Sequence, residues 1–323
     1  MNLQVLRLLF RFFFSQPFAV EAPAKITAFG GILLAQEMPM RFVLAIIVLI
    51  GLSITQGDAQ QVLEAEFPFE LREGLIWIQV NVPQSAESLH FLLDSGAEVS
   101  VIDLGVARRL RLKLGHPVGV SGVNSTVPGY WPQYLSAHLG SVLLPKSYLA
   151  VDLRELSKAC DCEVDGLLGA NFFREHLVQI DFQARKIRLL KSINPDACSE
   201  SVPLEPRRSG IRILLQVNGG KQQWLRLDTG CASALQWVPP RMPAEPFLYK
   251  TAVGMTEVLV PLVETTVRIG TVEFAHVATG IEDHRIFVGE DGLLGTGLLS
   301  RFAAITIDTS AHRLILRAAH ALD

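Results

Sequence analysis

Residues 88–99 read SLHFLLDSGAEV, and residues 223–234 read QWLRLDTGCASA. In each stretch an apolar run ends in an acidic triplet, DSG at 94–96 and DTG at 228–230. A single triplet of this kind predicts only a turn, because Asp, Ser, Thr and Gly are residues that turns favour. The sequence on either side of the two triplets therefore decides what they mean.

The neighbouring sequence repeats in the same order. Ahead of the triplets, FPFELREGLIWIQVN (67–81) aligns with VPLEPRRSGIRILLQVN (202–218). After them, VDGLLGANFFREHLVQIDFQARKIRLL (164–190) aligns with EDGLLGTGLLSRFAAITIDTSAHRLIL (290–316). The offsets between matching positions drift only slowly: 216 − 79 = 137, 228 − 94 = 134, 292 − 166 = 126 and 308 − 181 = 127. The chain therefore contains an internal duplication.

Each repeat has the size of a small domain. A unit of this length exceeds the roughly 20–50 residues of a solenoid repeat, and it fits one independent lobe. We expect an N-terminal lobe at 60–191 and a C-terminal lobe at 202–323. The linker is expected at 192–201, within the proline-containing stretch INPDACSESVPLEP (193–206).

The composition is typical of a folded protein. Hydrophobic residues make up 49% of the 323 residues and charged residues 19%, which is enough apolar material for one core per lobe. The net charge of −3 and the absence of a basic stripe argue against a nucleic-acid partner.

Residues 1–59 are predicted to form a leader. Arg41 precedes the apolar run FVLAIIVLIGLSI (42–54), and small residues follow as far as Ala59, which is the pattern of a signal peptide. The run is shorter than the roughly 20 apolar residues of a membrane span. We expect export with cleavage; the alternative is a retained N-terminal segment that anchors the protein to a membrane. Translation is suspected to start at Met38 or Met40.

The remaining chain is predicted to be mostly β-strand. Asn218-Gly219-Gly220 has the residues of a tight hairpin turn. Short runs rich in Val, Ile, Leu and aromatic residues, bounded by turn residues, predict strands at 75–82, 88–94, 211–217, 223–228 and 259–270. Brief helices are expected at 106–114, 171–177 and 297–302.

Two matched carboxyl groups suggest a specific chemistry. Hydrolysis of a peptide bond by an activated water needs a base and an acid, and two carboxyls that share one proton supply both. Like charges close together cannot both ionise, so their pKa values separate. Each half offers one such group, Asp94 or Asp228, and Gly96 and Gly230 would let two backbones approach closely.

The triplets, the DGLLG elements at 165–169 and 291–295 and the closing Ile-Asp strands resemble the retropepsin-like aspartic peptidases of bacteria, within the wider pepsin and retropepsin group. The resemblance covers roughly residues 65–190 and 202–317. It implies an all-β fold of two acid-protease β-barrel lobes with few short helices, related by a pseudo-twofold axis. A flap would cover the cleft in each lobe, expected at 119–130 and 249–258.

The resemblance also implies roles for single residues. The catalytic carboxylates would be Asp94 and Asp228. The supporting active-site loops would contain Ser95, Gly96, Thr229 and Gly230, and the residues packing behind the aspartate loops would be Leu168, Gly169, Leu294 and Gly295. The implied protein is an exported aspartic endopeptidase that acts on peptides or unfolded proteins, as a monomer and without a cofactor. The alternative is a catalytically inactive peptide-binding module of the same fold.

Two positions depart from the family pattern. Ser95 stands where Thr is usual, which keeps the hydroxyl group. Cys231 stands where Ala, Ser or Thr is usual, and neither Ala97 nor Cys231 is a strong donor to the carboxylate beside it. We therefore hypothesise that the pKa values of the pair are less depressed than in enzymes with a hydroxyl there, so that activity is greatest in weak acid.

The remaining polar residues indicate structural uses. Cys198 could form a disulfide with Cys160 or Cys162, and free thiols are the alternative. Asp181 and Asp308 are expected to cap strand turns. The histidines show no zinc-ligand spacing, so no metal site is expected.

Overall fold

The computed structural model describes residues 62–319 except 123–124, 133, 194–198, 243–246 and 254–255. All of these residues belong to the compact unit formed by 57–323. The expected leader at 1–59, both candidate start sites and Cys198 lie outside the described residues. Within the described part of the chain, no helix combines the length and apolar character needed to cross a membrane.

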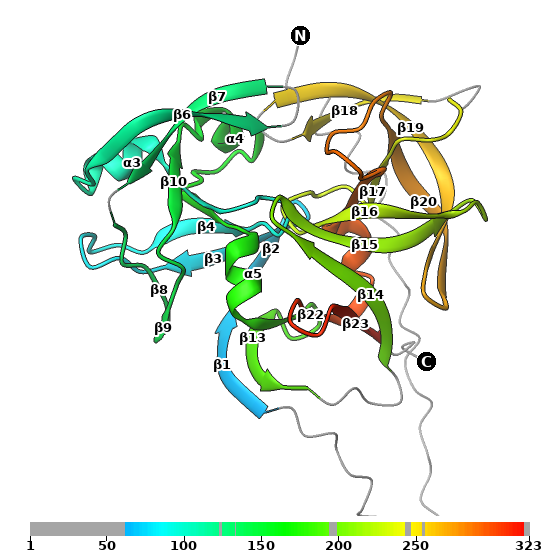
Figure 1. Ribbon diagram of the computed structural model, residues 1–323, viewed down its shortest axis with the longest axis horizontal. Helices are drawn as coiled ribbons and strands as arrows, with labels where there is room; N and C mark the ends of the chain where they lie inside the picture. The colour runs from blue at the N-terminus through cyan, green and yellow to red at the C-terminus, as the bar shows by residue number, and fades with distance from the viewer. Residues whose placement is uncertain are drawn as a thin grey trace, which may run out of the picture. The chain divides into compact units, whose positions relative to one another are not determined.

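The described part of the chain is mostly β, with four short helices (Figure 1), which confirms the predicted all-β class. The strands of the first half are β1 (Val62–Pro68), β2 (Glu70–Arg72), β3 (Leu75–Val80), β4 (Leu89–Leu93), β5 (Ser100–Asp103), β6 (Leu114–Gly122), β7 (Ser125–Pro132), β8 (His138–Leu139), β9 (Val142–Leu143), β10 (Tyr148–Val151), β11 (Gly166–Leu168), β12 (Leu177–Asp181) and β13 (Lys186–Ser192). Those of the second half are β14 (Ser199–Arg207), β15 (Gly210–Val217), β16 (Gln222–Asp228), β17 (Leu235–Trp237), β18 (Phe247–Val253), β19 (Thr256–Ile269), β20 (Val272–Ile281), β21 (Gly292–Gly295), β22 (Phe302–Asp308) and β23 (Arg313–Ala318). The helices are α3 (Leu104–Arg109), α4 (Arg154–Ala159), α5 (Ala170–Glu175) and α6 (Thr296–Leu299).

The two halves share one order of strands. In the first half the order is β3-β4-β11-β5-β10-β7-β6, and in the second it is β15-β16-β21-β17-β20-β19-β18. Each neighbouring pair also runs in the same relative direction in both halves, with the parallel pairs at matching places. The internal duplication of the sequence is therefore a duplication of strand topology.

Among the described residues, a closed ring of strands is found in the second half alone. Strand β19 pairs with β15 as well as with β20, and this pairing closes a six-stranded barrel of β15, β16, β21, β17, β20 and β19. The corresponding pairing between β3 and β7 is not found among the described residues of the first half. Of the two barrels that the sequence predicts, the described residues therefore contain the one in the second half.

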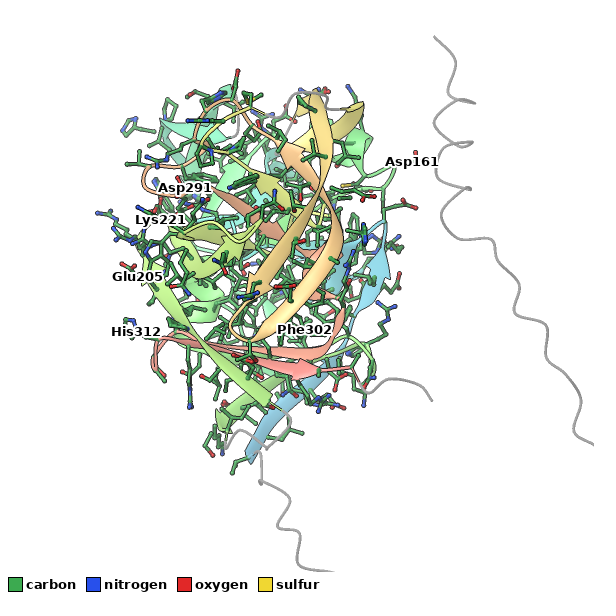
Figure 2. All side chains as sticks on the ribbon, turned by 90° about the vertical axis from the view of Figure 1, so that its right-hand side faces the viewer. Asp161, Glu205, Lys221, Asp291, Phe302 and His312 are labelled. Atoms are coloured by element: carbon green, nitrogen blue, oxygen red, sulfur yellow. The ribbon has the colours of Figure 1, made fainter. Side chains whose placement is uncertain are left out.

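The two halves are joined by a sheet with the order β1-β13-β12-β22-β23-β14. At its centre the antiparallel pair β12–β22 places Val178 opposite Ile307 and Ile180 opposite Ile305, all fully buried. Phe302, labelled in Figure 2, packs edge to face on Phe274 of β20 with ring centroids 5.3 Å apart. This contact connects the joining sheet to the barrel.

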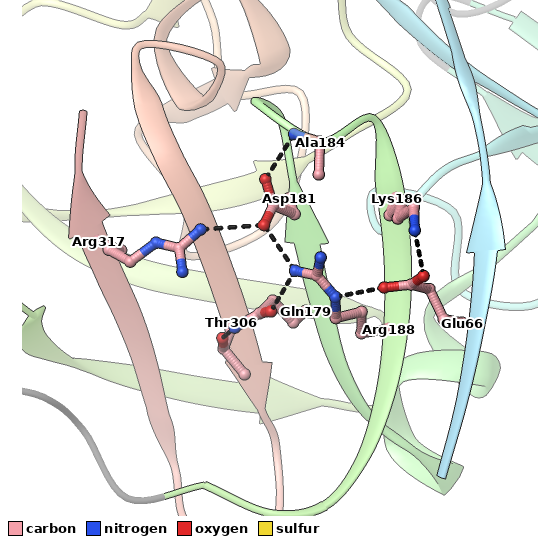
Figure 3. Close-up of polar contacts among 8 residues, drawn as sticks. All are labelled: Glu66, Gln179, Asp181, Ala184, Lys186, Arg188, Thr306 and Arg317. Atoms are coloured by element: carbon pink, nitrogen blue, oxygen red, sulfur yellow. Dashed lines mark hydrogen bonds and ion pairs between the residues drawn. The ribbon is translucent and has the colours of Figure 1, made fainter. Parts of the chain in front are cut away.

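An ion network covers one face of the joining sheet (Figure 3). Arg188 donates to Asp181 at 2.5 Å and to Glu66 at 2.6 Å, and Arg317 reaches Asp181 from the second half at 2.9 Å. The Ala184 N–H also donates to Asp181 at 2.8 Å. The predicted turn-capping use of Asp181 is therefore confirmed, with ion pairs in addition.

Asp308 plays the same part in the second half. Its carboxylate accepts the Ala311 N–H at 3.0 Å, as a turn cap does, and pairs with Arg313 at 3.0 Å. This confirms the second predicted cap.

Several predicted elements differ in detail. Helix α3 begins earlier than expected because Asp103 caps it by accepting the Val106 N–H at 2.9 Å. Helix α4 was not expected, since it has no buried residue and therefore no apolar stripe in the sequence. The turn at Asn218-Gly219 is as predicted, with positive φ angles of 49° and 66°. The two expected flaps are hairpins, β6–β7 and β18–β19, whose tips lie outside the described residues.

Candidate active site

The two aspartate loops leave equivalent strands at equivalent places. Asp94 directly follows β4, and its N–H donates to the Leu168 carbonyl of the parallel strand β11 at 2.9 Å. Asp228 ends β16 and lies in register with Gly295 of the parallel strand β21. In each half a parallel neighbour thus fixes the point at which the acidic residue leaves the sheet.

The loops hold each other through four reciprocal hydrogen bonds. The Ser95 N–H donates to Thr229 Oγ1 at 2.9 Å, and the Thr229 N–H donates to Ser95 Oγ at 3.1 Å. The Ser95 hydroxyl donates to the Leu227 carbonyl at 2.7 Å, and the Thr229 hydroxyl donates to the Leu93 carbonyl at 2.8 Å. Ser95 and Thr229 are fully buried. These hydroxyls satisfy buried backbone groups of the opposite half, where an unpaired group would cost about 1–3 kcal/mol.

Each carboxyl group lies against the glycine of the other triplet. A Cβ atom on Gly96 would lie 2.4 Å from Asp228 Cγ, and one on Gly230 would lie 2.5 Å from Asp94 Cγ. Real Cβ atoms do not approach other atoms so closely. The two glycines therefore make room for the two carboxyls, which the structure brings together from opposite halves.

The two carboxyls differ in their backbone donors. Asp94 Oδ1 accepts the N–H of Gly96 at 2.9 Å and that of Ala97 at 3.1 Å. Asp228 Oδ1 accepts the N–H of Gly230 at 3.0 Å. Hydrogen bonds of this kind stabilise the ionised form of a carboxyl. Asp94 is thus better prepared than Asp228 to carry a negative charge.

Both carboxyls hold their protons more strongly than a carboxyl in water. Burial raises the pKa of Asp94, against the opposing effect of the Ala97 and Gly96 N–H groups. Burial, followed by the charge of Asp94, raises the pKa of Asp228 to about 8. Because the charge of Asp94 raises the pKa of Asp228, and a hydrogen bond with Asp228 lowers that of Asp94, the last proton to leave the pair is held mainly by Asp228.

The predicted packing residues lie behind the loops. Leu168 and Leu294 are fully buried in the main core. A Cβ atom on Gly169 would lie 2.5 Å from the Val99 backbone, and one on Gly295 would lie 2.1 Å from the Ser233 carbonyl oxygen. The glycines thus allow the strands β11 and β21 to approach the chain that follows each triplet.

Cys231 does not contact the carboxyl oxygens through its thiol. Its sulfur lies 3.1 Å from Ser233 Oγ. Burial, followed by the charge of Asp228, raises the pKa of the thiol to about 12, so it remains protonated. Neither this residue nor Ala97 supplies a hydroxyl to the pair, as the sequence indicated.

A buried ion pair beside the site was missed by the sequence analysis. Arg226, two residues before Asp228, pairs with Glu290 through Nε at 2.7 Å and Nη2 at 3.2 Å, and both side chains are 2% exposed. Its third nitrogen, Nη1, donates to the Gly96 carbonyl at 2.9 Å. The guanidinium also lies over the Phe287 ring, 3.3 Å from its centroid.

A signal for this pair was present in the duplication. Aligning the triplets places Arg226 opposite Leu92, and aligning the DGLLG elements places Glu290 opposite Val164. Opposite charges at two positions that are both apolar in the other half indicate a buried pair.

Other candidate residues have separate places. Cys160 and Cys162 have free thiols, and the disulfide proposed with Cys198 involves a residue outside the described ones. Trp131 is 45% exposed on β7. The described residues contain no group of three or more metal-ligating side chains. No protein-family model matches the sequence, and no curated protein matches it.

Proposed function

We propose that this protein is an aspartic endopeptidase whose two lobes, related by a pseudo-twofold axis, contribute one catalytic carboxyl each. The observation that carries the proposal is the approach of Asp94 and Asp228 across the four reciprocal hydrogen bonds of their loops. Each carboxyl lies against the other triplet's glycine, which is the arrangement that two groups sharing a proton require.

The register of the joining sheet supports the axis. Adding the sequence offset of 127 turns Val178 into position 305 and Ile180 into position 307. Val178 pairs with Ile307, and Ile180 pairs with Ile305. If each residue is replaced by its equivalent in the other repeat, the first pair becomes the second and the second becomes the first. A twofold operation has this property, because the contact of i with j is matched by one of j with i.

The donor pattern supports different roles for the two carboxyls. Asp94, with two N–H donors, is the ionised base that takes a proton from the attacking water. Asp228, whose pKa is raised to about 8, is the acid that donates its proton to the carbonyl oxygen of the scissile peptide. The tetrahedral intermediate then collapses as Asp94 passes the proton it gained to the leaving nitrogen and Asp228 takes back the proton of the hydroxyl that becomes the new carbonyl oxygen, so the pair returns to its one-proton state.

The substrate class follows from the same arrangement. The hairpins β6–β7 and β18–β19 stand at the two expected flap positions, and we infer that they cover an extended peptide or an unfolded segment of protein. The proposed enzyme is exported, acts as a monomer and uses neither a metal nor a cofactor. Association with a membrane would require that the N-terminal segment be retained.

Hydrolysis of an unstructured protein such as reduced casein between pH 3 and 7 tests the proposal. The wild type is expected to produce fragments, while Asp94→Asn and Asp228→Asn, which keep the size of the side chain, are expected to lose at least about a thousandfold in rate. Thermal unfolding of each variant serves as the control for folding.

Two results would contradict the proposal. One is the absence of cleavage by folded wild-type protein over this pH range, with retention of peptide binding, which would favour the inactive peptide-binding module. The other is full activity in either Asn variant.

A further inference from the structure

Arg226 connects the two aspartate loops by a route separate from the serine and threonine hydroxyls. It belongs to β16 of the second half, yet its Nη1 donates to the Gly96 carbonyl of the first half at 2.9 Å. Glu290 holds the other two nitrogens, so the guanidinium has a fixed orientation. A Cβ atom on Gly210 would lie 2.9 Å from Arg226 Cζ, which shows how closely the backbone encloses this group.

The contact reaches Asp94 through a single peptide unit. The Gly96 carbonyl that accepts from Arg226 belongs to the same peptide group as the Ala97 N–H, and that N–H donates to Asp94 Oδ1 at 3.1 Å. A cation on the carbonyl polarises the peptide and makes its N–H a stronger donor, because hydrogen bonds in a chain strengthen one another. The peptide thus transmits the charge of Arg226 to Asp94.

The fold does not need an ion pair at these positions. In the first half Leu92 and Val164 stand at the equivalent places, 2% and 1% exposed, within an apolar cluster. A buried ion pair is seldom more stable than well-packed apolar side chains of similar volume. Stability alone therefore does not account for Arg226 and Glu290.

We propose that Arg226 is a positioning residue that assigns the roles of the two carboxyls, keeping Asp94 as the ionised base and leaving the shared proton on Asp228. The inference rests on the proposed peptidase function and deepens it. Because the pair exists on one side only, the duplicated site is chemically asymmetric although its loops are alike.

The charge of Arg226 acts on both carboxyls, and the hydrogen bond to the Gly96 carbonyl is what directs its effect toward Asp94. Burial raises the pKa of both carboxyls, and the positive charge of Arg226 opposes that rise in each. The other titratable groups that face the pair are Glu290, which lies behind Arg226, and the Cys231 thiol, which stays protonated. Among the leading influences on the pKa values of the two carboxyls, the positive charge is that of Arg226.

The test is a pH titration of the aspartate carboxyls by carbon-13 NMR in protein labelled at aspartate, with the pH profile of kcat/KM measured in parallel. Three variants are expected to shift the pKa of the pair by different amounts or in different directions. They are Arg226→Met, Glu290→Gln, and the double variant Arg226→Leu with Glu290→Val, which copies the first half. Arg226→Lys, which keeps the charge, is the conservative control.

We expect the lower macroscopic pKa of the pair to rise by about one pH unit in Arg226→Met, since a nearby opposite charge lowers a carboxyl pKa by about 1–3. It should rise less in the double variant, where both charges are gone, and fall in Glu290→Gln, where Arg226 is left without its counter-charge. Arg226→Lys should stay closer to the wild type than Arg226→Met. The acidic limb of kcat/KM should move in the same directions.

A pKa that rises in Arg226→Met and falls in Glu290→Gln distinguishes an electrostatic role from a structural one. A loss of packing does not depend on whether the charge removed is positive or negative. If the folded double variant and Glu290→Gln both titrate as the wild type does, the inference is overturned while the peptidase proposal stands. If the wild type cleaves nothing but the carboxyls shift as expected, the peptidase proposal fails while the coupling of charge to the pair stands. The double variant keeps the test open should Arg226→Met fail to fold.

Discussion

The strands that lead to the two aspartates are alike at the loops and unlike beside them. In the first half, Leu92, Val101 and Val164 belong to an apolar cluster. At the corresponding places in the second half stand Arg226, Gln236 and Glu290, all of them buried. The two halves therefore share the hydrogen bonds that connect them and differ in the layer next to the carboxyls.

This difference shows which residues can be substituted in one half without affecting the other. Ser95 and Thr229 form reciprocal bonds, so a change in one alters the backbone of the other. Arg226 has no charged counterpart in the first half. Arg226 and Glu290 could therefore be replaced together without any change in the first half. A duplicated fold can thus keep its shared loops and acquire an asymmetric electrostatic environment.

The largest expected effect is on stability, in Arg226→Met. The substitution leaves Glu290 buried without its partner, and removal of one member of a buried ion pair costs about 3–5 kcal/mol. The double variant Arg226→Leu with Glu290→Val should lose far less, because both charges are removed and apolar groups fill the space as in the first half. Urea unfolding measures both. Equal losses in the single and double variants would show that the pair contributes packing only.

The second prediction concerns the glycines that face the carboxyls. Gly96→Ala and Gly230→Ala should each lower kcat/KM by about a hundredfold or more, since a displacement of the carboxyls by about 1 Å is enough for that loss. Gly219→Ala is the control for a loss of stability alone: a Cβ atom there meets nothing within 4 Å, but the positive φ of 66° disfavours Ala, so this variant should lose stability without losing kcat/KM. Similar losses in the two site variants would show that both halves contribute equally to the geometry. Full activity in either would contradict the contact of glycine with carboxyl.

Most of the loop chemistry could be predicted from the sequence, and most of its electrostatics could not. The triplets and the Leu-Leu-Gly elements can be recognised in the sequence because each occurs twice. Their local geometry follows from the residue types. Arg226 sits in WLRLD, where an alternating charge in a strand suggests a solvent-exposed side chain. Its burial depends on Glu290, which comes from a distant part of the chain, and on the Gly96 carbonyl of the other half.

The third prediction compares the two hydroxyls. Ser95→Ala and Thr229→Ala each remove one hydroxyl that accepts an N–H and donates to a carbonyl across the halves, so each should cost about 1–3 kcal/mol of stability. The double variant should cost less than the sum of the two, because both hydroxyls serve one shared contact. Chemical denaturation of the four proteins gives this coupling. Simple additivity would mean that the two halves hold together independently of the loops.

The fourth prediction compares the acid stability of the two capping aspartates. Burial opposes the ionisation of Asp181, but the Ala184 N–H, Arg188 and Arg317 outweigh it and hold its pKa below the usual value. The pKa of Asp308 is lowered in the same way, and the cationic partner of this carboxylate is Arg313. For a carboxyl with a lowered pKa, the added stability is fully present above the unfolded pKa of about 3.9 and is lost as the pH falls through the folded value.

Asp181→Asn should therefore lower the melting temperature near pH 6 more than Asp308→Asn does, because it breaks two arginine contacts, one of which joins the halves. The difference between each variant and the wild type should shrink as the pH falls below about 4, because the carboxyl takes up a proton first in the unfolded chain and then, at lower pH, in the folded protein. A difference that stays constant down to pH 2 would show that these carboxyls contribute no ionic stability.

The smallest expected effect is at the residue after the second triplet. Wild-type activity should be greatest in weak acid, because no hydroxyl side chain at Ala97 or Cys231 stabilises the ionised pair. Cys231→Ser replaces the thiol, on which the charge of Asp228 already acts, with a stronger donor. It should move the acidic limb of kcat/KM downward, by less than the change expected from Arg226, since a neutral hydroxyl acts more weakly than a guanidinium. Cys231→Ala, which adds no donor, is the control. An optimum below about pH 3 in the wild type, set against pair values of ~1.5 and ~4.7 in a well-studied member of the pepsin group, would contradict the weak-acid expectation. An unchanged limb in Cys231→Ser, with Arg226→Met shifted, would place the control of pH on the second-half ion pair alone.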